Sequence, residues 1–435
     1  MNSLARNILR TFSTQVGCQV MAVLLGIVIA RTIGPSGKGF FSYAAMCVSF
    51  VSVFFYGFSD AALLQYGKRR ESARAVHGIT LRILVATLAI IIPVFVVLAT
   101  VVPSQRPLAA AAAALPFAMY VQVMTPFVMV KDNVKLLNVI SLGQSLGTAL
   151  CTIPLLLFAH LGLGAVLGVW LFFYALAGLQ VARAMRPILE DSPPALATQK
   201  KLFGEQLHFG LRAAGSSVAG FLNMRVGIFM VSFLFAPAAL GWYTLAIGTG
   251  ELLWQVSRAF VWSALGRIGS DPLPEAAALV ARVTRNTLAI VGSSGLVAFI
   301  IGPWLIVHVY GEGFAPAGAA LRWALPGLVA YAAEVSLTKF IILQLARPVT
   351  IICVQLSSAL ICALATLALA SRFGIIAAAG STSVTFLLVT IVLLTIFVRG
   401  TGIPLGRLLV IQREDLRHYV GIVATMLRTL RLRSA

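Results

Sequence analysis

The sequence predicts an all-α polytopic membrane protein with twelve transmembrane helices. Hydrophobic residues make up 60% of the 435 residues, and charged residues make up only 11%. Soluble domains are about 45–50% apolar and about 25% charged, so this composition excludes a water-soluble fold. The apolar residues form continuous runs of about 20 residues, the length that a helix needs to cross a bilayer. A transmembrane β-barrel would instead show alternating segments of about ten residues.

Stretches without charged residues place the six helices of the first half. The first two lie between Arg10 and Arg31 and between Lys38 and Asp60; the next two lie between Arg82 and Arg106 and between Arg106 and Lys131; the last two share the interval from Lys135 to Arg183, with a turn at His160–Gly164. The first run exceeds the hydrophobic region of about 7–15 residues in a cleaved signal peptide, so we expect it to remain as a helix.

Charged residues interrupt three helices of the second half, which we place at Leu207–Phe235, Leu240–Leu265 and Leu321–Leu345. The other three helices lie in the uncharged intervals from Arg285 to Glu312, from Arg347 to Arg372 and from Arg372 to Arg399. Each of these intervals is long enough for one crossing of the bilayer.

The distribution of basic residues predicts the orientation. The chain carries 33 basic and 13 acidic residues, a formal net charge of +20. With the N-terminus inside, most basic residues fall in cytoplasmic segments, as the positive-inside rule requires. We therefore expect a multi-pass protein of the cell inner (plasma) membrane with both termini cytoplasmic. The positive charge is expected to face anionic lipids rather than nucleic acid.

Two short motifs recur in the two halves of the chain. The segment Gly34–Ala44 aligns with Ala236–Ala246, and Gly162–Gly168 aligns with Gly374–Gly380. The matching order favours an internal duplication, although Pro-Gly turns also recur by coincidence between membrane helices. A duplication predicts two six-helix lobes related by a pseudo-two-fold axis along the membrane normal, with a transport cavity between them.

The repeat divides the chain into three parts. We expect an N-terminal lobe with its linker at residues 1–198, a C-terminal lobe at residues 199–400 and a tail at residues 401–435. The linker is expected at Arg183–Gln206, where prolines accompany charged residues. The tail is basic with apolar residues at helical spacing, so it is expected to lie on anionic lipid as an amphipathic helix. Docking of a partner enzyme is the alternative role of this tail.

Motifs of several other protein classes fail in this chain. The segment Gly34–Gly39 looks like a phosphate-binding loop, but Gly39 rather than Ser or Thr follows Lys38. Leu64 stands where the loop signature of major-facilitator transporters has an Asp. The five cysteines lie in apolar runs, and the five histidines are scattered without a Ser/His/Asp arrangement. We therefore expect no catalysis, no disulfide and no bound metal or cofactor.

Five segments carry a resemblance to a known family: Ala30–Gly39, Tyr56–Ala62, Leu222–Arg225, Pro237–Tyr243 and Val309–Phe314. With these segments the chain resembles the polysaccharide and O-antigen flippase branch of the multidrug/oligosaccharidyl-lipid/polysaccharide exporter superfamily. Gly227 stands where the family often has an Asp, two residues after the arginine of the seventh helix. No cation or proton role is therefore carried over from that carboxylate.

The resemblance implies a function in the synthesis of surface polysaccharide. The expected substrate is a polyprenyl-pyrophosphate-linked oligosaccharide, an O-antigen or exopolysaccharide unit, which crosses the membrane by alternating access. Glycosyltransferases or a polysaccharide polymerase are the expected partners. The alternatives are a cation-coupled multidrug exporter of the same superfamily, which would need acidic residues in its cavity, and a membrane scaffold that recruits glycosyltransferases through its basic tail.

Charged residues inside the predicted helices are the candidate functional residues, because a charge at the bilayer centre costs about 2.5–3.5 kcal/mol. Four cations are predicted to form a path for the anionic head group, and they are Arg225, Lys339, Arg258 and Arg212. A guanidinium group suits phosphate because its planar fork can donate two parallel hydrogen bonds.

Two acidic residues accompany these cations. Glu251 and Glu334 are predicted to act as gates or as ion-pair partners. Glu251 is expected at the same depth as Arg225, so a structural ion pair between neighbouring helices is the alternative for these two residues. Glu251 is also seven residues from Arg258, and the two are expected to share one face of the eighth helix.

Overall fold

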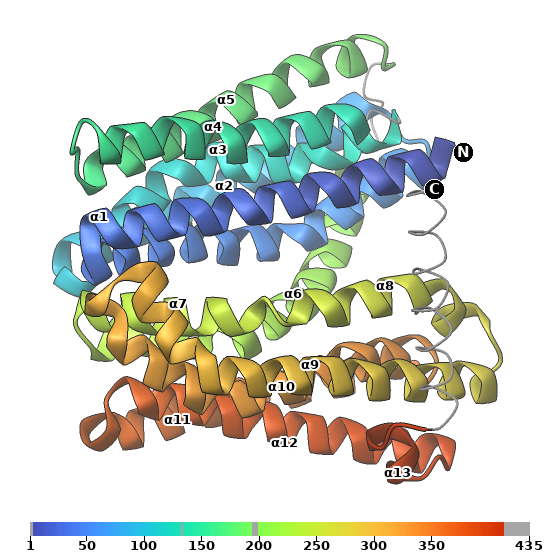
Figure 1. Ribbon diagram of the computed structural model, residues 1–435. Coiled ribbons are helices and arrows are strands. Elements are labelled where there is room, and N and C mark those ends of the chain that lie inside the picture. The colour runs from blue at the N-terminus through green and yellow to red at the C-terminus, as the bar shows by residue number, and fades with distance from the viewer. Residues whose placement is uncertain (1–2, 132–133, 194–198, 413–435) are drawn as a thin grey trace, which may run out of the picture. The chain divides into compact units, whose positions relative to one another are not determined.

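The computed structural model describes residues 3–131, 134–193 and 199–412 (Figure 1). All regular elements in these ranges are helical. Ten of the described stretches are long and apolar enough to cross a membrane. The predicted all-α membrane fold is therefore confirmed. The amphipathic tail falls mostly on residues 413–435, which lie outside the described residues.

The helices of the first half follow the order expected from the uncharged intervals. They are α1 (Ser3–Ala62), the π-helix η1 (Leu63–Lys68), α2 (Ala73–Val101), the 3₁₀-helix η2 (Pro103–Gln105), α3 (Pro107–Val130), α4 (Val134–Leu157) and α5 (Leu163–Glu190). The later elements are α6 (Gln199–Leu234), α7 (Pro237–Glu251), α8 (Trp254–Ser270), α9 (Leu273–Tyr310), η3 (Glu312–Phe314), α10 (Ala315–Leu343), α11 (Pro348–Phe373), α12 (Ile375–Thr401) and α13 (Leu405–Leu409).

The first two predicted helices are joined in α1 without a loop. The apolar stretch Ser13–Lys68 has 56 residues, which would extend about 84 Å as a straight helix, far more than one bilayer. Gly34 turns the chain back with φ 77° and ψ −174°, and Pro35 begins the second segment (Figure 1). Only glycine adopts such a positive φ without steric cost, and proline suits the first turn of a helix.

The eighth predicted helix is interrupted. We expected one helix at Leu240–Leu265, but α7 ends at Glu251 and α8 begins at Trp254, with Leu252 and Leu253 in a turn between them. The prediction of a continuous helix is wrong here, because Leu252 and Leu253 are as apolar as the helix around them and give no sequence signal of a break. The break also removes the common helix face that we expected for Glu251 and Arg258.

The linker between the predicted halves is shorter than expected. The prediction placed it at Arg183–Gln206, but α5 continues to Glu190 and α6 begins at Gln199. Arginine, alanine, methionine and glutamate are good helix formers, so they extend both helices beyond the apolar core. Pro187 lies in the last turn of α5, where a helix ends soon afterwards in any case.

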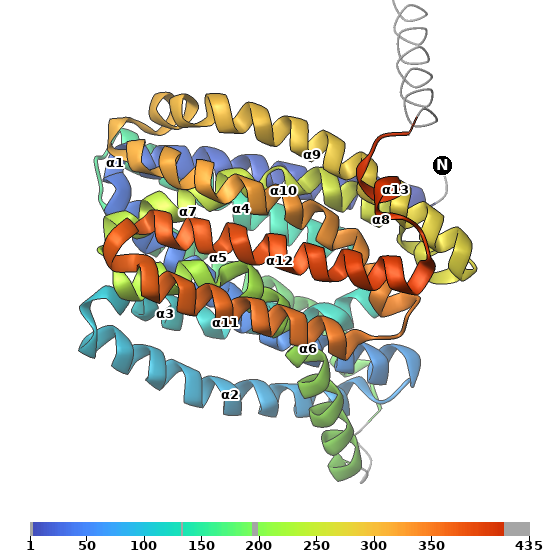
Figure 2. The ribbon, with the colours of Figure 1, turned by 90° about the horizontal axis from the view of Figure 1, so that it is seen from below.

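The described residues divide into two compact units. Unit 1 comprises the residues up to Thr244 together with Ile306–Pro316, and unit 2 comprises Leu245–Leu305 and the residues from Ala317 onward. In unit 1, α1 packs against α3, α4 and α6. In unit 2, α11 and α12 run side by side (Figure 2). The boundaries of the two predicted lobes and their symmetry axis stay predictions.

Apolar side chains also cover the outside of the helices. On α2 these exposed residues are Val85, Ile90, Val94, Val97 and Val101. On α11 they are Leu356, Leu360, Leu364 and Leu367. A soluble protein rarely exposes apolar stripes of this length, so these faces are the ones that contact lipid.

Candidate functional site

The loops predicted to be cytoplasmic meet at one end of unit 1. Arg69 forms an ion pair with Glu205. Arg74 donates hydrogen bonds to the backbone oxygens of Leu189 and Glu190, at 2.6 and 3.3 Å. These contacts join the start of α2 to the end of α5, and η1 to the start of α6. We call this the basic end.

Buried amides add to the closure of the basic end. Gln65 donates a hydrogen bond of 3.1 Å to the backbone oxygen of Leu202. Gln206 donates one of 2.7 Å to the hydroxyl of Thr80. Both glutamines are almost inaccessible, at 2% and 0% exposure. Because a buried amide is costly without partners, these bonds fix the start of α6 against η1 and α2.

The opposite end of unit 1 holds Gly34, Pro103 and Pro237, and we call it the outer end, after the predicted orientation. A buried polar network lies there. The hydroxyl of Tyr43 donates a hydrogen bond of 2.7 Å to Oε1 of Gln105, and Nε2 of Gln105 donates one of 3.3 Å to the backbone oxygen of Ser232. The network connects α1, η2 and α6. Its side chains are buried, with Tyr43 2% and Gln105 0% exposed.

The two repeated motifs are in backbone contact at the outer end. A Cβ atom placed on Gly39 would lie 2.4 Å from the backbone oxygen of Pro237, and one placed on Gly241 would lie 2.0 Å from that of Pro35. The contact is reciprocal, because Pro35 and Gly39 occupy the same motif positions as Pro237 and Gly241. We call these four residues the glycine contact.

Arg225 lies inside unit 1 on an aromatic face of α6. Phe221 and Phe229, one turn before and one turn after it, place their ring centroids 5.5 and 5.7 Å from that of Phe50 on α1. Residues four apart share a helix face, so half-buried Arg225 lies on the face that α6 turns toward α1. It is about 15 Å from the outer end of its helix. Arg212, in contrast, is exposed and lies on a different face of α6.

Unit 2 contains a break in the backbone of a helix, between α7 and α8. Trp254, the first residue of α8, is 1% exposed and donates a hydrogen bond of 2.8 Å from Nε1 to the backbone oxygen of Leu328. Its ring centroid lies 4.1 Å from that of Tyr331. Gly250 makes room for Leu328, whose Cδ1 would be 2.3 Å from a Cβ atom on that glycine. The broken helix is therefore held against the middle of α10.

The remaining candidate residues surround this break in unit 2. Glu334 lies one turn after Tyr331 and is 2% exposed, with the side chain of Gln355 in hydrogen-bond contact. Glu251, the last residue of α7, is half-buried. Lys339 and Arg258 are exposed. The structure thus places Glu251 at the helix break and Glu334 on α10, which packs against the break. It leaves Lys339 and Arg258 exposed.

Sequence reasoning missed three residues of these sites. Trp254 and Tyr331 give no signal in a sequence that is rich in aromatic residues. Lys38 was expected in an outer loop, but it lies in α1 and is half-buried, with Nζ 3.0 Å from where a Cβ atom of Gly26 would be. Gly26 lies in the first segment of α1 and Lys38 in the second, and the missing side chain of Gly26 leaves room for the lysine. This glycine is the sequence signal that could have indicated the contact. The described residues contain no group of three potential metal ligands.

Comparison with known proteins places the chain in a family. A family model described as polysaccharide biosynthesis protein matches residues 28–318. The chain belongs to this family of polysaccharide biosynthesis proteins. No curated protein matches the sequence. The match covers both segments of α1 beyond Val28, the aromatic face around Arg225 and the break between α7 and α8.

Solved structures share the fold of this polysaccharide biosynthesis protein. An inward closed lipid II flippase MurJ superposes with a TM-score of 0.73 at 13% identity, covering 89% of this chain and 87% of that chain. An inward-facing multidrug resistance MATE transporter of the MOP superfamily has a TM-score of 0.62 at 12% identity, covering 88% and 94%. A MOP superfamily transporter from Pyrococcus furiosus has a TM-score of 0.57 at 12% identity, covering 92% and 94%.

The fold therefore belongs to flippases and transporters, as the resemblance predicted. At these identities the superpositions show the architecture, and the chemistry comes from the residues of this chain. The family links the chain to polysaccharide biosynthesis, and the shared architecture is that of multi-pass membrane proteins.

Proposed function

We propose that the protein moves a polyprenyl-pyrophosphate-linked oligosaccharide, an O-antigen or exopolysaccharide unit, across the inner membrane by alternating access. The observation that carries this proposal is Arg225, a guanidinium held on an inward-facing aromatic side of α6 within a membrane-spanning stretch. An intramembrane charge is costly, so its retention favours a functional role. The family supplies the link to polysaccharide synthesis.

Arg225 would recognise the pyrophosphate of the substrate. A guanidinium can form two parallel hydrogen bonds to a phosphate, and the surrounding phenylalanine rings lower the local dielectric and strengthen them. The sugar hydroxyls would need a wet cavity, because each unsatisfied polar group costs several kcal/mol in hydrocarbon. Arg212, Arg258 and Lys339 are accessible and would guide the anion before and after it meets Arg225.

The broken helix of unit 2 supports a transport site as well. In transporters, interrupted helices near the middle of the membrane commonly form substrate sites. Glu251 ends the first half of the interrupted helix, and Glu334 lies on the helix that holds the break through Leu328 and Tyr331. We propose that these two acidic residues prevent the anion from binding too tightly and act as gates.

The glycine contact would be the gate at the outer end. Gly39 and Gly241 allow the two motifs to meet backbone to backbone, and such a contact separates without unpairing buried charges. Release of the substrate on the outer side would require this separation. In the proposed orientation both termini are cytoplasmic. Anionic lipids, glycosyltransferases or a polymerase would be the partners on that side.

The membrane potential would drive this movement. An inside-negative potential favours outward transfer of an anion by about 2.3 kcal/mol per charge per 100 mV, so we propose that a coupling ion is not required. Flipping in proteoliposomes that stops without an ion gradient, at a voltage fixed by ionophore, would contradict this part of the proposal.

Transport by arginine variants tests the proposal. Arg225→Gln should lower the rate of flipping of a fluorescent lipid-linked oligosaccharide in proteoliposomes about 10–100-fold, since a hydrogen bond to a charged group contributes about 1.5–3 kcal/mol. Arg225→Lys should restore only part of the rate, because a lysine lacks the planar fork. Arg82→Gln is the matched control, since Arg82 is an exposed arginine of α2. Equal rates for Arg225→Gln and Arg82→Gln would refute the role of Arg225.

The second candidate function is cation-coupled drug export, and buried Glu334 is the observation in its favour. A drug and proton antiporter needs an acidic residue shielded from water, and Glu334 meets this condition. Efflux of a cationic dye that is lost in Glu334→Gln, with unchanged flipping of the lipid-linked oligosaccharide, would favour this second function over the first.

A further inference from the structure

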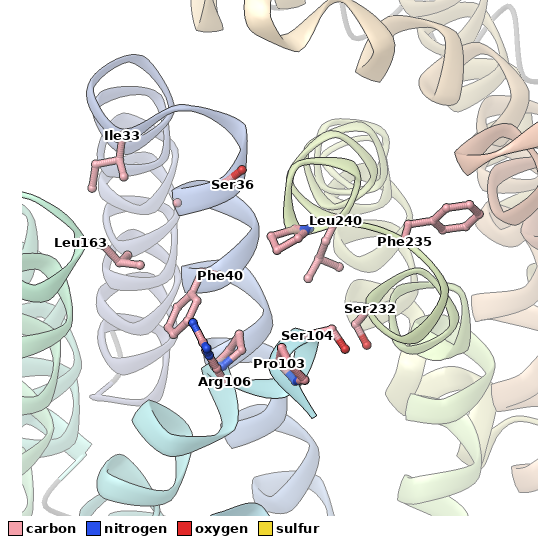
Figure 3. Close-up of a pocket in the computed structure, with 13 residues that line it drawn as sticks. Ile33, Ser36, Phe40, Pro103, Ser104, Arg106, Leu163, Ser232, Phe235 and Leu240 are labelled. Carbon is pink, nitrogen blue, oxygen red and sulfur yellow. The ribbon is translucent and has the colours of Figure 1, made fainter. Parts of the chain in front are cut away.

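A cavity lies at the outer end of unit 1 and is not used by the proposed transport site. Its volume is about 420 Å³, within the range of about 300–1,000 Å³ that small-molecule sites occupy. Four parts of the chain form its walls: the kink of α1, the η2–α3 junction, the start of α5 and the α6–α7 junction (Figure 3). The walls thus come from segments far apart in the sequence.

The cavity is apolar with one charged group. Ile33, Phe40, Leu163 and Leu240 supply apolar walls. Arg106 is the charged lining residue, and Figure 3 shows its side chain directed toward Phe40. This combination differs from the site of a sugar, which needs several polar groups that fix its hydroxyls.

The polar side of the cavity is rigid. Ser104 and Ser232 lie close together in Figure 3, and both belong to the network of Gln105. Nε2 of Gln105 contacts the hydroxyl of Ser104 at 3.4 Å and the backbone oxygen of Ser232 at 3.3 Å. Buried Tyr43 holds Gln105 from the other side. The cavity is therefore a preformed feature of the fold.

The two arginines at the outer end differ in their partners. Arg31 donates a hydrogen bond of 2.7 Å to the backbone oxygen of Val309 and another to that of His308, so its guanidinium is engaged in structure. Arg106 is exposed, and within residues 3–131, 134–193 and 199–412 its guanidinium forms no hydrogen bond or ion pair. Its donors are therefore available to an anion.

The cavity also adjoins the glycine contact. Gly37 and Pro237 line it, and Pro237 is itself a member of that contact. A molecule in the cavity would touch the segment that we propose as the outer gate. The position therefore suits a molecule that is leaving through the gate.

We propose that this cavity holds the lipid end of the translocated polyprenyl-pyrophosphate-linked oligosaccharide, with its pyrophosphate on Arg106 and the adjoining part of its isoprenoid chain between Phe40, Leu163 and Leu240. This inference rests on the proposed function and assigns a release site to it. The guanidinium supplies the charge that a phosphate requires, and the apolar walls supply the surface that a hydrocarbon chain requires. One cationic residue beside apolar walls fits a single-chain lipid with an anionic head group.

Photo-crosslinking in the full-length protein tests the release site. A photoreactive benzoylphenylalanine at position 240 should capture radiolabelled decaprenyl pyrophosphate in nanodiscs. Arg106→Gln should reduce this capture about tenfold, which is the loss of one charge-assisted contact of about 1.4 kcal/mol. Arg372→Gln is the control, since Arg372 is an exposed arginine on α11 in unit 2, and it should capture the lipid as well as the unmodified chain. Ser36→Trp, which fills the cavity, should also reduce capture.

Competition identifies the ligand. Unlabelled decaprenyl pyrophosphate should displace the probe, whereas decaprenol, inorganic phosphate and phosphatidylglycerol should displace it much less. Equal displacement by decaprenol overturns the role of Arg106, and preferential displacement by phosphatidylglycerol overturns the assignment of a polyprenyl lipid. The Arg225→Gln variant should still capture the lipid probe at position 240, although it no longer flips the lipid-linked oligosaccharide. Loss of capture in Arg106→Gln but not in Arg225→Gln would support the release site even if Arg225 proved dispensable for transport, so the two proposals fail separately.

Discussion

The two ends of unit 1 are closed in different ways. At the basic end, side chains join the helices through the Arg69–Glu205 ion pair and the hydrogen bonds of Gln65 and Gln206. At the outer end, Gly39 and Gly241 bring backbones together beside a cavity and the buried hydrogen bonds of Tyr43 and Gln105. A backbone contact without side chains can separate and re-form more readily than a set of side-chain bonds. The difference fits the proposal that unit 1 stays anchored at its basic end and opens at its outer end.

The largest effect is expected from substitution in the glycine contact. Gly241→Val places a side chain where even a Cβ atom would lie 2.0 Å from the Pro35 oxygen. The helices must separate, so we expect a cysteine at position 40 to react faster with a membrane-impermeant reagent, and transport to fall. Gly248→Ala is the control on the same helix, since nothing lies within 4 Å of a Cβ atom there. Unchanged reactivity in Gly241→Val would show that this contact is not a gate.

A glycine near the basic end should respond differently. A Cβ atom on Gly57 would lie 2.3 Å from the backbone oxygen of Gly210, where α1 crosses α6. Gly57→Ala should therefore lower the thermal stability of the purified protein by about 1–3 kcal/mol through overpacking, without raising the reactivity at position 40. The same substitution at Gly215, where no atom lies within 4 Å, serves as the control. Increased reactivity at position 40 would remove the distinction between the two ends.

The buried network at the outer end should contribute a similar amount. Tyr43→Phe removes the hydroxyl that donates to Gln105 and leaves the amide oxygen buried without that donor. We expect a loss of about 1–3 kcal/mol of stability, measured as a lower unfolding temperature in detergent. Thr244→Val provides a comparison on α7, because the Thr244 hydroxyl donates to backbone oxygens of its own helix, those of Leu240 and Gly241. Equal losses for both variants would mean that the network does not stabilise the cavity.

The smallest effect is expected from the exposed ion pair at the basic end. Arg69 and Glu205 have exposed side chains, at 48% and 38%. Exposed pairs contribute about 0–1 kcal/mol and weaken with salt. The double variant Arg69→Gln with Glu205→Gln should thus be nearly as stable as the parent in 0.5 M salt. A large loss at high salt would show that the pair, rather than buried Gln65 and Gln206, closes this end.

Composition and charge predicted the crossings but not their irregularities. The uncharged intervals place the helices because lipid excludes charge. The repeated motif at Gly34 and Ala236 was recognised, but the contact between its two copies was found only in the structure. The sequence did not reveal that Gly34 alone reverses the chain between the two predicted helices, without an intervening loop. The break at Leu252 and Leu253 was invisible because hydropathy carries no information on backbone hydrogen bonds.

The candidate site shows a similar division. Arg225, Glu251 and Glu334 were predicted from the cost of intramembrane charge, and the structure places each in or beside a packed, membrane-spanning helix. The partners Trp254 and Tyr331, and the cavity at Arg106, depend on contacts between segments far apart in the chain. Such contacts follow from packing in three dimensions, so a single sequence does not contain them in a readable form.

The central claim is that the guanidinium of residue 225 serves passage of a pyrophosphate rather than the strength of the fold. The direct measurement is flipping of a lipid-linked oligosaccharide by Arg225→Gln in proteoliposomes, with the unfolding temperature recorded on the same preparation. We predict a protein that unfolds near the temperature of the parent and has lost most of its flipping activity. A variant that flips at the parental rate, or that loses activity only in proportion to lost stability, would contradict the account.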